Sequence, residues 1–416
     1  DQETGDAILM WSPVTTGIHS GYVGDVTYNV VRYPDSVTVA TGLTDAEFGE
    51  TLPSDKALQT YSYGVIAVNG TQTSKENVSN KCVFGAAIVP PYREPMDNPS
   101  SLDLYTIIDN NQDGATWAYN EKEGAASYMY SRVNDGDDWL ITPALQLKGG
   151  KLYSVSFETS GYGYSYLERL EVRYGNQPTV EAMTHQLLDT TEVSSPDYMK
   201  YTCEIAVDTD QKLFVGFHAV SPANEYRLYL KNVEVYEGLS LTLADSAKDL
   251  RLEADREGKL FVKGSFKTPT LTLGGDSLGS TLTKVEVLRN GQLIQTYEQP
   301  DTAIALEFTD DEPVNGFNDY VVKVYTLEGE GRSANGRVYV GIDTPQYPKR
   351  PSLTDQTNSI RMEWSPVGTV GANGGVVKPE EVWYKVYDVV QTGDGMMGQL
   401  RDSVQGTSYE IPYNTM

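Results

Sequence analysis

Apolar and polar residues alternate along most of this 416-residue chain, in short runs separated by glycine, proline and asparagine. In the clearest runs, 61–68 and 320–326, tyrosine, valine, and alanine or threonine occupy every second position. A period of two places alternate side chains on one face of a β-strand. The pattern therefore predicts an all-β chain built from many short strands.

A four-residue segment recurs near the two ends of the chain. Trp-Ser-Pro-Val stands at 11–14 and again at 364–367, each time after an Asp-Gln pair, at 1–2 and 355–356. A glycine-rich stretch and a strand with tyrosine follow each copy. Because the copies are so widely separated, they cannot be halves of one domain. They indicate a tandem array of similar units.

These units resemble fibronectin type III domains. In that family, strand B carries an inward tryptophan, which Trp11 and Trp364 match. Strand F carries a tyrosine followed by alternating apolar residues, which Tyr61 and Tyr320 match. The resemblance implies a β-sandwich in which each of these tyrosines forms a corner that bonds back to backbone.

Proline-rich segments mark the predicted boundaries, at Pro90-Pro91 and at the stiff spacer 345–351. The interior copy lacks the tryptophan, and 260–262 (Leu-Phe-Val) is expected to take its place. The first copy is expected to lack its first strand, and the last to stop at Met416 before strand F, as in a fragment of a longer chain. The predicted domains are 1–90, fibronectin-like; 91–238, a larger jelly roll; 239–344, fibronectin-like; and 345–416, partly fibronectin-like.

Residues 92–237 do not follow the fibronectin pattern. Their markers are Asp-Asp-Trp-Leu-Ile-Thr-Pro at 137–143, Gly-Gly-Lys-Leu-Tyr at 149–153, and closing strands near 214–218 and 228–235. These segments resemble the cleaved-adhesin, or choice-of-anchor J, jelly roll of bacterial surface proteins such as the adhesin domains attached to gingipains. The resemblance implies binding rather than catalysis, and calcium that stiffens the domain.

Oxygen side chains alternate in one turn of this unit, ending at a glycine that permits a tight bend. Calcium is held by six to eight oxygens, and this spacing supplies three from one turn. The alternative is an Asx-rich turn whose side chains bond their own backbone. The predicted calcium ligands are Asp109, Asn111, Asp113, Asp138 and Glu158.

Tyr162, Tyr164 and Tyr166 alternate with glycine and serine farther along. If the segment is extended, the three rings share one face and could stack on sugar C–H surfaces, with hydroxyls for orientation. The alternative is an ordinary tyrosine-rich strand packed on its neighbour. The three tyrosines are the predicted ligand-binding residues.

Charge and composition narrow the function further. The chain has 58 acidic and 32 basic residues, a net charge of −26 that repels nucleic acid. No apolar run is long enough to span a membrane. Three histidines, His19, His185 and His218, form no metal-ligand pair. Cys82 and Cys203 fall in different predicted domains, so no disulfide is expected.

The sequence therefore predicts a non-catalytic adhesion protein of the extracellular space or outer cell surface of a bacterium. Its predicted partner is a glycan or an extracellular protein, bound mainly by the jelly roll of a chain of monomeric modules. Two alternatives remain: a spacer that presents other domains, and a sandwich glycosidase that uses Asp138 and Glu158 as its carboxylate pair.

Overall fold

The computed structural model describes residues 4–280, 282–392 and 395–413. Asp1, Gln2 and Met416, which entered the interpretation of the repeats, lie outside these residues. The regular structure is almost entirely β-strand, which confirms the predicted all-β class. Within the described ranges, no helix is long and apolar enough to cross a membrane. The chain divides into two compact units, Asp1–Ser240 and Leu241–Met416.

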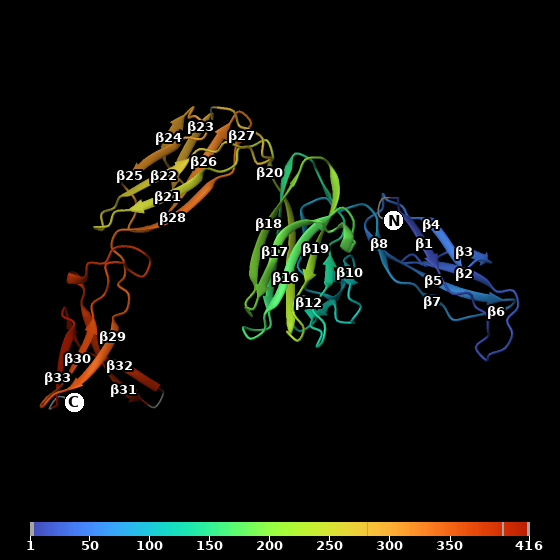
Figure 1. Cartoon of the computed structure of the whole chain (residues 1–416), viewed down its shortest axis with the longest axis horizontal. Helices are drawn as coiled ribbons and strands as arrows, with labels where there is room; N and C mark the ends of the chain where they lie inside the picture. The colour runs from blue at the N-terminus through green and yellow to red at the C-terminus, as the bar shows by residue number, and fades with distance from the viewer. Residues whose placement is uncertain (1–3, 281, 393–394, 414–416) are drawn as a thin grey trace. The chain divides into compact units, whose positions relative to one another are not determined.

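The first unit begins with a small sandwich, here called the first repeat (Figure 1). One sheet pairs β1 with β4, and the other has the order β3-β2-β5-β6, with β7 and β8 also on β5. Tyr28, Val30 and Tyr63 are buried between them. Its strands are β1 Asp6–Met10, β2 Thr27–Tyr33, β3 Val37–Leu43, β4 Glu47–Thr51, β5 Gln59–Asn69, β6 Gln72–Thr73, β7 Asn77–Val78 and β8 Cys82–Phe84.

The jelly roll follows in the same unit. One sheet has the order β10-β13-β19-β16-β17, with β14 on β19, and the other β11-β12-β20-β15-β18, with β9 on β20. Its elements are β9 Tyr92–Glu94, η1 Pro99–Leu102, β10 Thr106–Asp109, β11 Trp117–Asn120, β12 Ala125–Met129, β13 Asp138–Ile141, β14 Leu145–Leu147, β15 Lys151–Gly161, β16 Glu168–Gly175, η2 Val180–Ala182, β17 His185–Val193, β18 Met199–Val207, β19 Gln211–Ala219 and β20 Arg227–Ser240.

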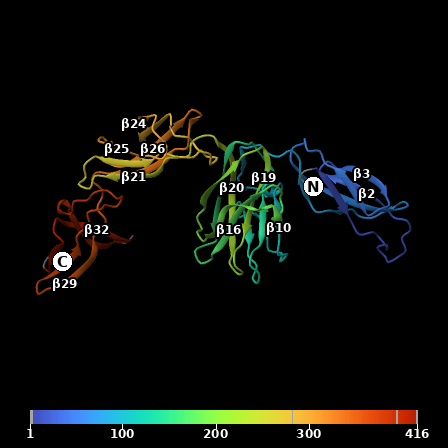
Figure 2. The same cartoon turned by 45° about the horizontal axis from the view of Figure 1, so that its top comes forward.

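A large apolar core joins the two jelly-roll sheets. Val155, Phe157, Phe217 and Leu230 are fully buried in it, and they come from β15, β19 and β20. The neighbouring strands β16 and β19 lie side by side in both views (Figures 1 and 2).

The strand β20 runs on to Ser240, past the predicted boundary at 238. Both cysteines are free thiols.

The second unit contains two further sandwiches, here called the second and third repeats. The sheets of the second have the orders β21-β22-β25 and β24-β23-β26-β27, with β28 on β26; those of the third are β29-β30-β33 and β31-β32. Their elements are β21 Lys248–Ala254, β22 Val262–Lys267, β23 Lys284–Arg289, β24 Gln292–Glu298, β25 Ala305–Asp310, β26 Gly316–Thr326, β27 Gly329–Glu330, β28 Ala334–Val340, β29 Lys349–Asp355, β30 Ser359–Ser365, η3 Pro379–Glu381, β31 Tyr384–Thr392, β32 Gly395–Val404 and β33 Ser408–Pro412.

The Trp-Ser-Pro-Val segment has the same contacts in the first and third repeats. The Val14 backbone N–H donates to the Tyr28 hydroxyl at 2.8 Å, and the Val367 N–H donates to the Tyr384 hydroxyl at 3.1 Å. The tryptophan of each segment packs its ring on the same tyrosine, with ring centres 5.2 and 5.3 Å apart. The repeated sequence thus builds a repeated local structure.

Strand pairing also aligns the second repeat, and it corrects one prediction. Ala7 pairs with Glu50 in the first repeat, and Val262 pairs with Asp310 in the second. Trp11 lies four residues after Ala7, and Phe266 lies four residues after Val262. Phe266 is therefore the equivalent of Trp11. Phe266 is buried in the core. The prediction that residues 260–262 replace the tryptophan was wrong.

A buried brace of arginine, carboxylate and tyrosine links three strands of the second repeat. The Arg289 guanidinium donates to one oxygen of Asp310 at 2.7 Å, and the Tyr320 hydroxyl donates to the other at 2.7 Å. The tyrosine corner expected to bond to backbone is therefore bonded to a carboxylate. The cause is that the last residue of β25 is an aspartate that faces inward.

The first repeat has the same brace at the same positions. The carboxylate of Glu50 accepts from Arg32 at 2.8 Å and from the Tyr63 hydroxyl at 2.7 Å. The equivalent of Tyr320 is therefore Tyr63, not Tyr61 as the sequence pattern suggested. The hydroxyl of Tyr61 accepts from the Gln59 side chain instead. A shift of two residues along a strand keeps the same side chains on the same face, so the alternation of apolar and polar residues stays the same. The sequence alone therefore could not decide between Tyr61 and Tyr63.

Candidate functional site

Several loops of the jelly roll meet at one end of its sandwich, here called the loop end. Pairing places Asp109 opposite Asp138 on one sheet, and Met129 opposite Arg227 on the other. The loops that follow or precede these residues therefore leave the two sheets on the same side. They are residues 110–116, 130–137, 162–167 and 220–226.

Four tyrosines form a cluster on the loop end: Tyr130, Tyr162, Tyr166 and Tyr226. Tyr226 lies at the centre, with ring centres 4.2 Å from Tyr162, 5.5 Å from Tyr166 and 5.8 Å from Tyr130. Tyr164 takes part in none of the ring contacts found among the described residues, and its side chain is 71% exposed. The three predicted tyrosines thus form no single flat row.

Hydrogen bonds hold the backbone beneath this cluster in place. The Tyr226 N–H donates to the Glu168 carboxylate at 2.7 Å, and the Leu167 N–H donates to the Glu225 carboxylate at 2.7 Å. The Tyr130 N–H donates to the Tyr226 carbonyl. Glu168 is fully buried, and burial raises the pKa of its carboxyl. The rings therefore stand on loops fixed by the scaffold.

The acidic turn at 109–114 closes on its own backbone. The two Asp109 oxygens accept the N–H groups of Asp113 and Gly114 at 3.1 and 2.9 Å. Asn111 accepts the Asp113 N–H at 3.1 Å, and Asp113 in turn accepts the Ala115 N–H at 2.8 Å. Gly114 has a φ of +83°, which favours glycine. This is the Asx-turn arrangement, held together by its own amide donors.

Asp138 is the predicted ligand nearest to that turn. It is fully buried, and no well-formed hydrogen bond reaches its Oδ1, although the Thr116 hydroxyl lies near enough to lower its pKa in part. Burial raises the pKa of Asp138 to about 6, and the neighbouring carboxylates of Asp109 and Asp113 add to the shift. An orphaned buried oxygen beside two carboxylates is a feature that a cation would satisfy.

Glu158 does not join that cluster. It lies on β15 in the opposite sheet, on the face away from Phe157 and the core, with Lys231 4.0 Å from its carboxylate. Over the described residues, no three His, Cys, Asp or Glu side chains come together to hold a metal. The five predicted ligands are therefore not gathered, and calcium stays a prediction that centres on Asp109, Asp113 and Asp138.

The same placement bears on the glycosidase alternative. Two carboxylates that cleave a glycosidic bond face each other across roughly 5 to 10 Å of open space. Asp138 is buried on the inner face of its sheet, alongside Leu140, whereas Glu158 points outward from the other sheet. This pair cannot flank one sugar linkage, so the two carboxylates of the glycosidase alternative do not form a site.

A polar cluster that the sequence did not reveal lies beside the acidic turn. Nε2 of His218 is 2.8 Å from Asp137, its Nδ1 is 3.2 Å from Glu171, and its ring stacks on Trp139 at 4.0 Å. Burial would raise the pKa of Glu171, but hydrogen bonds from Arg173 and His218 hold it below its usual value. Both ring nitrogens are engaged, so His218 anchors structure and offers no free base.

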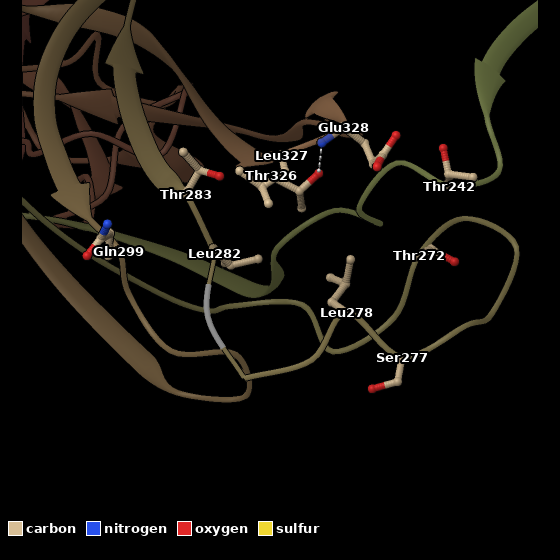
Figure 3. Close-up of a pocket in the computed structure, with 10 residues that line it drawn as sticks. All are labelled: Thr242, Thr272, Ser277, Leu278, Leu282, Thr283, Gln299, Thr326, Leu327 and Glu328. Carbon is tan, nitrogen blue, oxygen red and sulfur yellow. Dashed lines mark hydrogen bonds between the residues drawn. The ribbon is translucent and has the colours of Figure 1, made fainter.

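A cavity of about 420 Å³ lies in the second unit (Figure 3). Leu278, Leu282 and Leu327 line it together with threonine hydroxyls, and Glu328 is the charged residue among the ten that surround it. The Glu328 N–H donates to the Thr326 hydroxyl at 3.2 Å. This lining offers neither an aromatic face nor a titratable pair, so the loop end remains the stronger candidate.

Comparison with known proteins gave solved structures alone. No protein-family model and no curated protein matches the chain. The K3 cleaved adhesin domain of Lys-gingipain from Porphyromonas gingivalis is 16% identical, over 35% of this chain and 96% of that one, with a TM-score of 0.29. The K1 domain is 15% identical, over 36% and 99%, with a TM-score of 0.30. A xylan-binding domain from Paenibacillus barcinonensis is 10% identical, over 35% and 92%, with a TM-score of 0.25.

Proposed function

We propose that this chain is a non-catalytic binding protein of the bacterial cell surface that recognises a glycan through the loop end of its jelly roll. The observation that carries the proposal is the tyrosine cluster with the exposed Tyr164 beside it. Tyrosine offers an apolar ring face for sugar C–H groups and a hydroxyl for orientation. Loops on a rigid scaffold are the usual place for binding residues.

The negative charge around the tyrosine cluster limits the classes of ligand that can bind there. Asp135 and Glu225 hold the loops that carry the rings, through the N–H groups of Ala223 and Leu167. Together with the net charge of −26, they repel polyanions. A neutral or basic glycan therefore fits better than a sulfated or phosphorylated one. An extracellular protein with a basic patch is the second ligand class that this surface suits.

Replacing Tyr164 with alanine is expected to weaken glycan binding by about 1 kcal/mol, or roughly fivefold, without changing the melting temperature. The side chain is exposed and supports no core contact, so its loss should not affect folding. A glycan array identifies the ligand, and calorimetric titration then measures the change.

Tyr22→Ala is the matched control, because Tyr22 is 94% exposed in the first repeat and far along the chain from the loop end. Equal binding by both variants would contradict a role for Tyr164. Silence of the intact chain on glycan and matrix-protein arrays would favour the spacer function. Turnover of a polysaccharide by the intact chain would favour an enzyme that uses residues other than the Asp138 and Glu158 pair.

A further inference from the structure

A short hairpin loop with the same geometry follows β1, β22 and β30, the equivalent strands of the three repeats. It spans residues 16–22 in the first repeat, 271–277 in the second and 370–376 in the third, and its first and last residues form an antiparallel bridge. In each loop the second residue donates its N–H to the carbonyl of the sixth, at 2.8 or 2.9 Å. The fifth residue has a positive φ, of 60° in the first repeat and 90° in the other two. The three sequences differ, so the repeats share the shape of this hairpin rather than its residues.

In the second repeat this hairpin holds the segment that enters the repeat. The Leu273 N–H donates to the Leu243 carbonyl at 2.8 Å. The Gly274 N–H donates to the Leu241 carbonyl at 2.9 Å. In return, the Asp245 N–H donates to the carbonyl of the first hairpin residue at 3.0 Å. Backbone bonds in both directions therefore attach the linker to the repeat that follows it.

The third repeat holds its own entering segment with the same hairpin. The Ala372 N–H donates to the Thr344 carbonyl at 2.9 Å. The Val376 N–H donates to the Gly341 carbonyl at 3.0 Å, and the Val376 carbonyl accepts the Asp343 N–H at 2.8 Å. Two repeats with different sequences thus grip the preceding linker through the same structural element.

A buried carboxylate of the linker adds to the contact in the third repeat. One oxygen of Asp343 accepts the backbone N–H groups of Asn373 and Gly375, at 2.7 and 3.0 Å. The other oxygen accepts the Asn373 side-chain amide at 2.8 Å and the Thr344 N–H at 2.7 Å. Burial would raise the pKa of Asp343, but these donors hold it below its usual value. The carboxylate is therefore satisfied almost entirely by the hairpin that it faces.

Two glycines allow the hairpin to come this close to the linker. A Cβ at Gly371 would lie 2.5 Å from the carboxyl carbon of Asp343, and a Cβ at Gly375 would overlap the Tyr339 ring. The equivalent of Gly375 in the first repeat is Gly21. There, none of the described residues comes within 4 Å of the place where a Cβ would stand. The chain therefore offers one crowded and one open glycine at the same position of the same hairpin.

We propose that this hairpin is a linker clamp in the second and third repeats, which fixes the segment entering each repeat and keeps it from acting as a flexible hinge. Hydrogen bonds are directional, so a segment held through both its N–H and its carbonyl groups cannot swing freely. The proline-rich spacer 345–351 then starts from a fixed point. The clamp lies outside the jelly roll and does not depend on the function proposed for the loop end.

Hydrogen exchange of the full chain tests the clamp of the third repeat. In the unchanged chain, the backbone amides of Asp343 and Val376 should be protected, because each donates across the joint. Gly375→Ala crowds the joint and should speed the exchange of both amides about tenfold or more. The amides of β26 should keep their protection, which shows that the second repeat remains folded. Gly21→Ala is the matched control and should leave every one of these rates unchanged.

Two results would overturn the clamp: free exchange of these amides in the unchanged chain, or equally slow exchange in Gly375→Ala. If Gly375→Ala also exposed β26, Asn373→Ala would decide, because it removes one donor to Asp343 without crowding Tyr339. Faster exchange at Asp343 in that variant would support the clamp, and an unchanged rate would overturn it. Since the measurement involves no glycan, its outcome is independent of the function proposed for the loop end.

Discussion

Replacing Asp310 with alanine is expected to destabilise the second repeat by about 3 to 5 kcal/mol. Asp310, Arg289 and Tyr320 are all buried, and the carboxylate accepts from both partners at 2.7 Å. Removal of Asp310 leaves the guanidinium charge without a partner in the interior. Such a loss costs more than the intact brace contributes, because the orphaned charge keeps its desolvation penalty. Urea unfolding of the full chain, followed at the transition of this repeat, measures the change.

Glu50→Ala is the matched control, because it removes the same member of the equivalent brace in the first repeat. Arg32 there keeps Asp35 as a second partner at 2.6 Å, and both Arg32 and Glu50 are partly exposed. The expected cost is only about 1 kcal/mol. Equal losses for the two variants would show that burial does not set the strength of this brace.

The repeats show which structural features an alternating sequence pattern predicts and which it misses. Period two and the Trp-Ser-Pro-Val segment were sufficient to predict the sandwiches, because strand faces and local contacts follow from neighbouring residues. The position of Phe266 was missed because it depends on the register between β22 and β25. The brace was missed for the same reason: Arg289, Asp310 and Tyr320 stand on three strands that meet only in the fold.

At the loop end, too, the sequence could not show which distant residues come together. Tyr162 and Tyr166 were found from their spacing, whereas Tyr130 and Tyr226 come from loops that join them only in the fold. Glu158 is different, because the sequence already held the information. Alternation along β15 puts Phe157 inside and therefore puts Glu158 outside, away from any site inside the sandwich.

Calcium at millimolar concentration is expected to raise the melting temperature of the jelly roll, and Asp113→Ala is expected to abolish the rise. The carboxylates of Asp109 and Asp113 are near enough to Asp138 to help raise its pKa, and burial, the main cause, disfavours the charge on Asp138. An ion that binds only the folded domain stabilises it by about 2.7 kcal/mol at a hundredfold excess over its Kd. The first repeat, whose Glu50 is already paired with Arg32, should show no response.

Differential scanning calorimetry in calcium and in chelator separates these domains by their transitions. Glu158→Gln is the control, because Glu158 faces outward beside Lys231 and should leave the calcium response intact. Magnesium at the same concentration tests specificity, since its strict octahedral geometry suits a turn of this kind poorly. Identical transitions in calcium and in chelator would mean that the backbone donors at Asp113, Gly114 and Ala115 are sufficient to hold the turn.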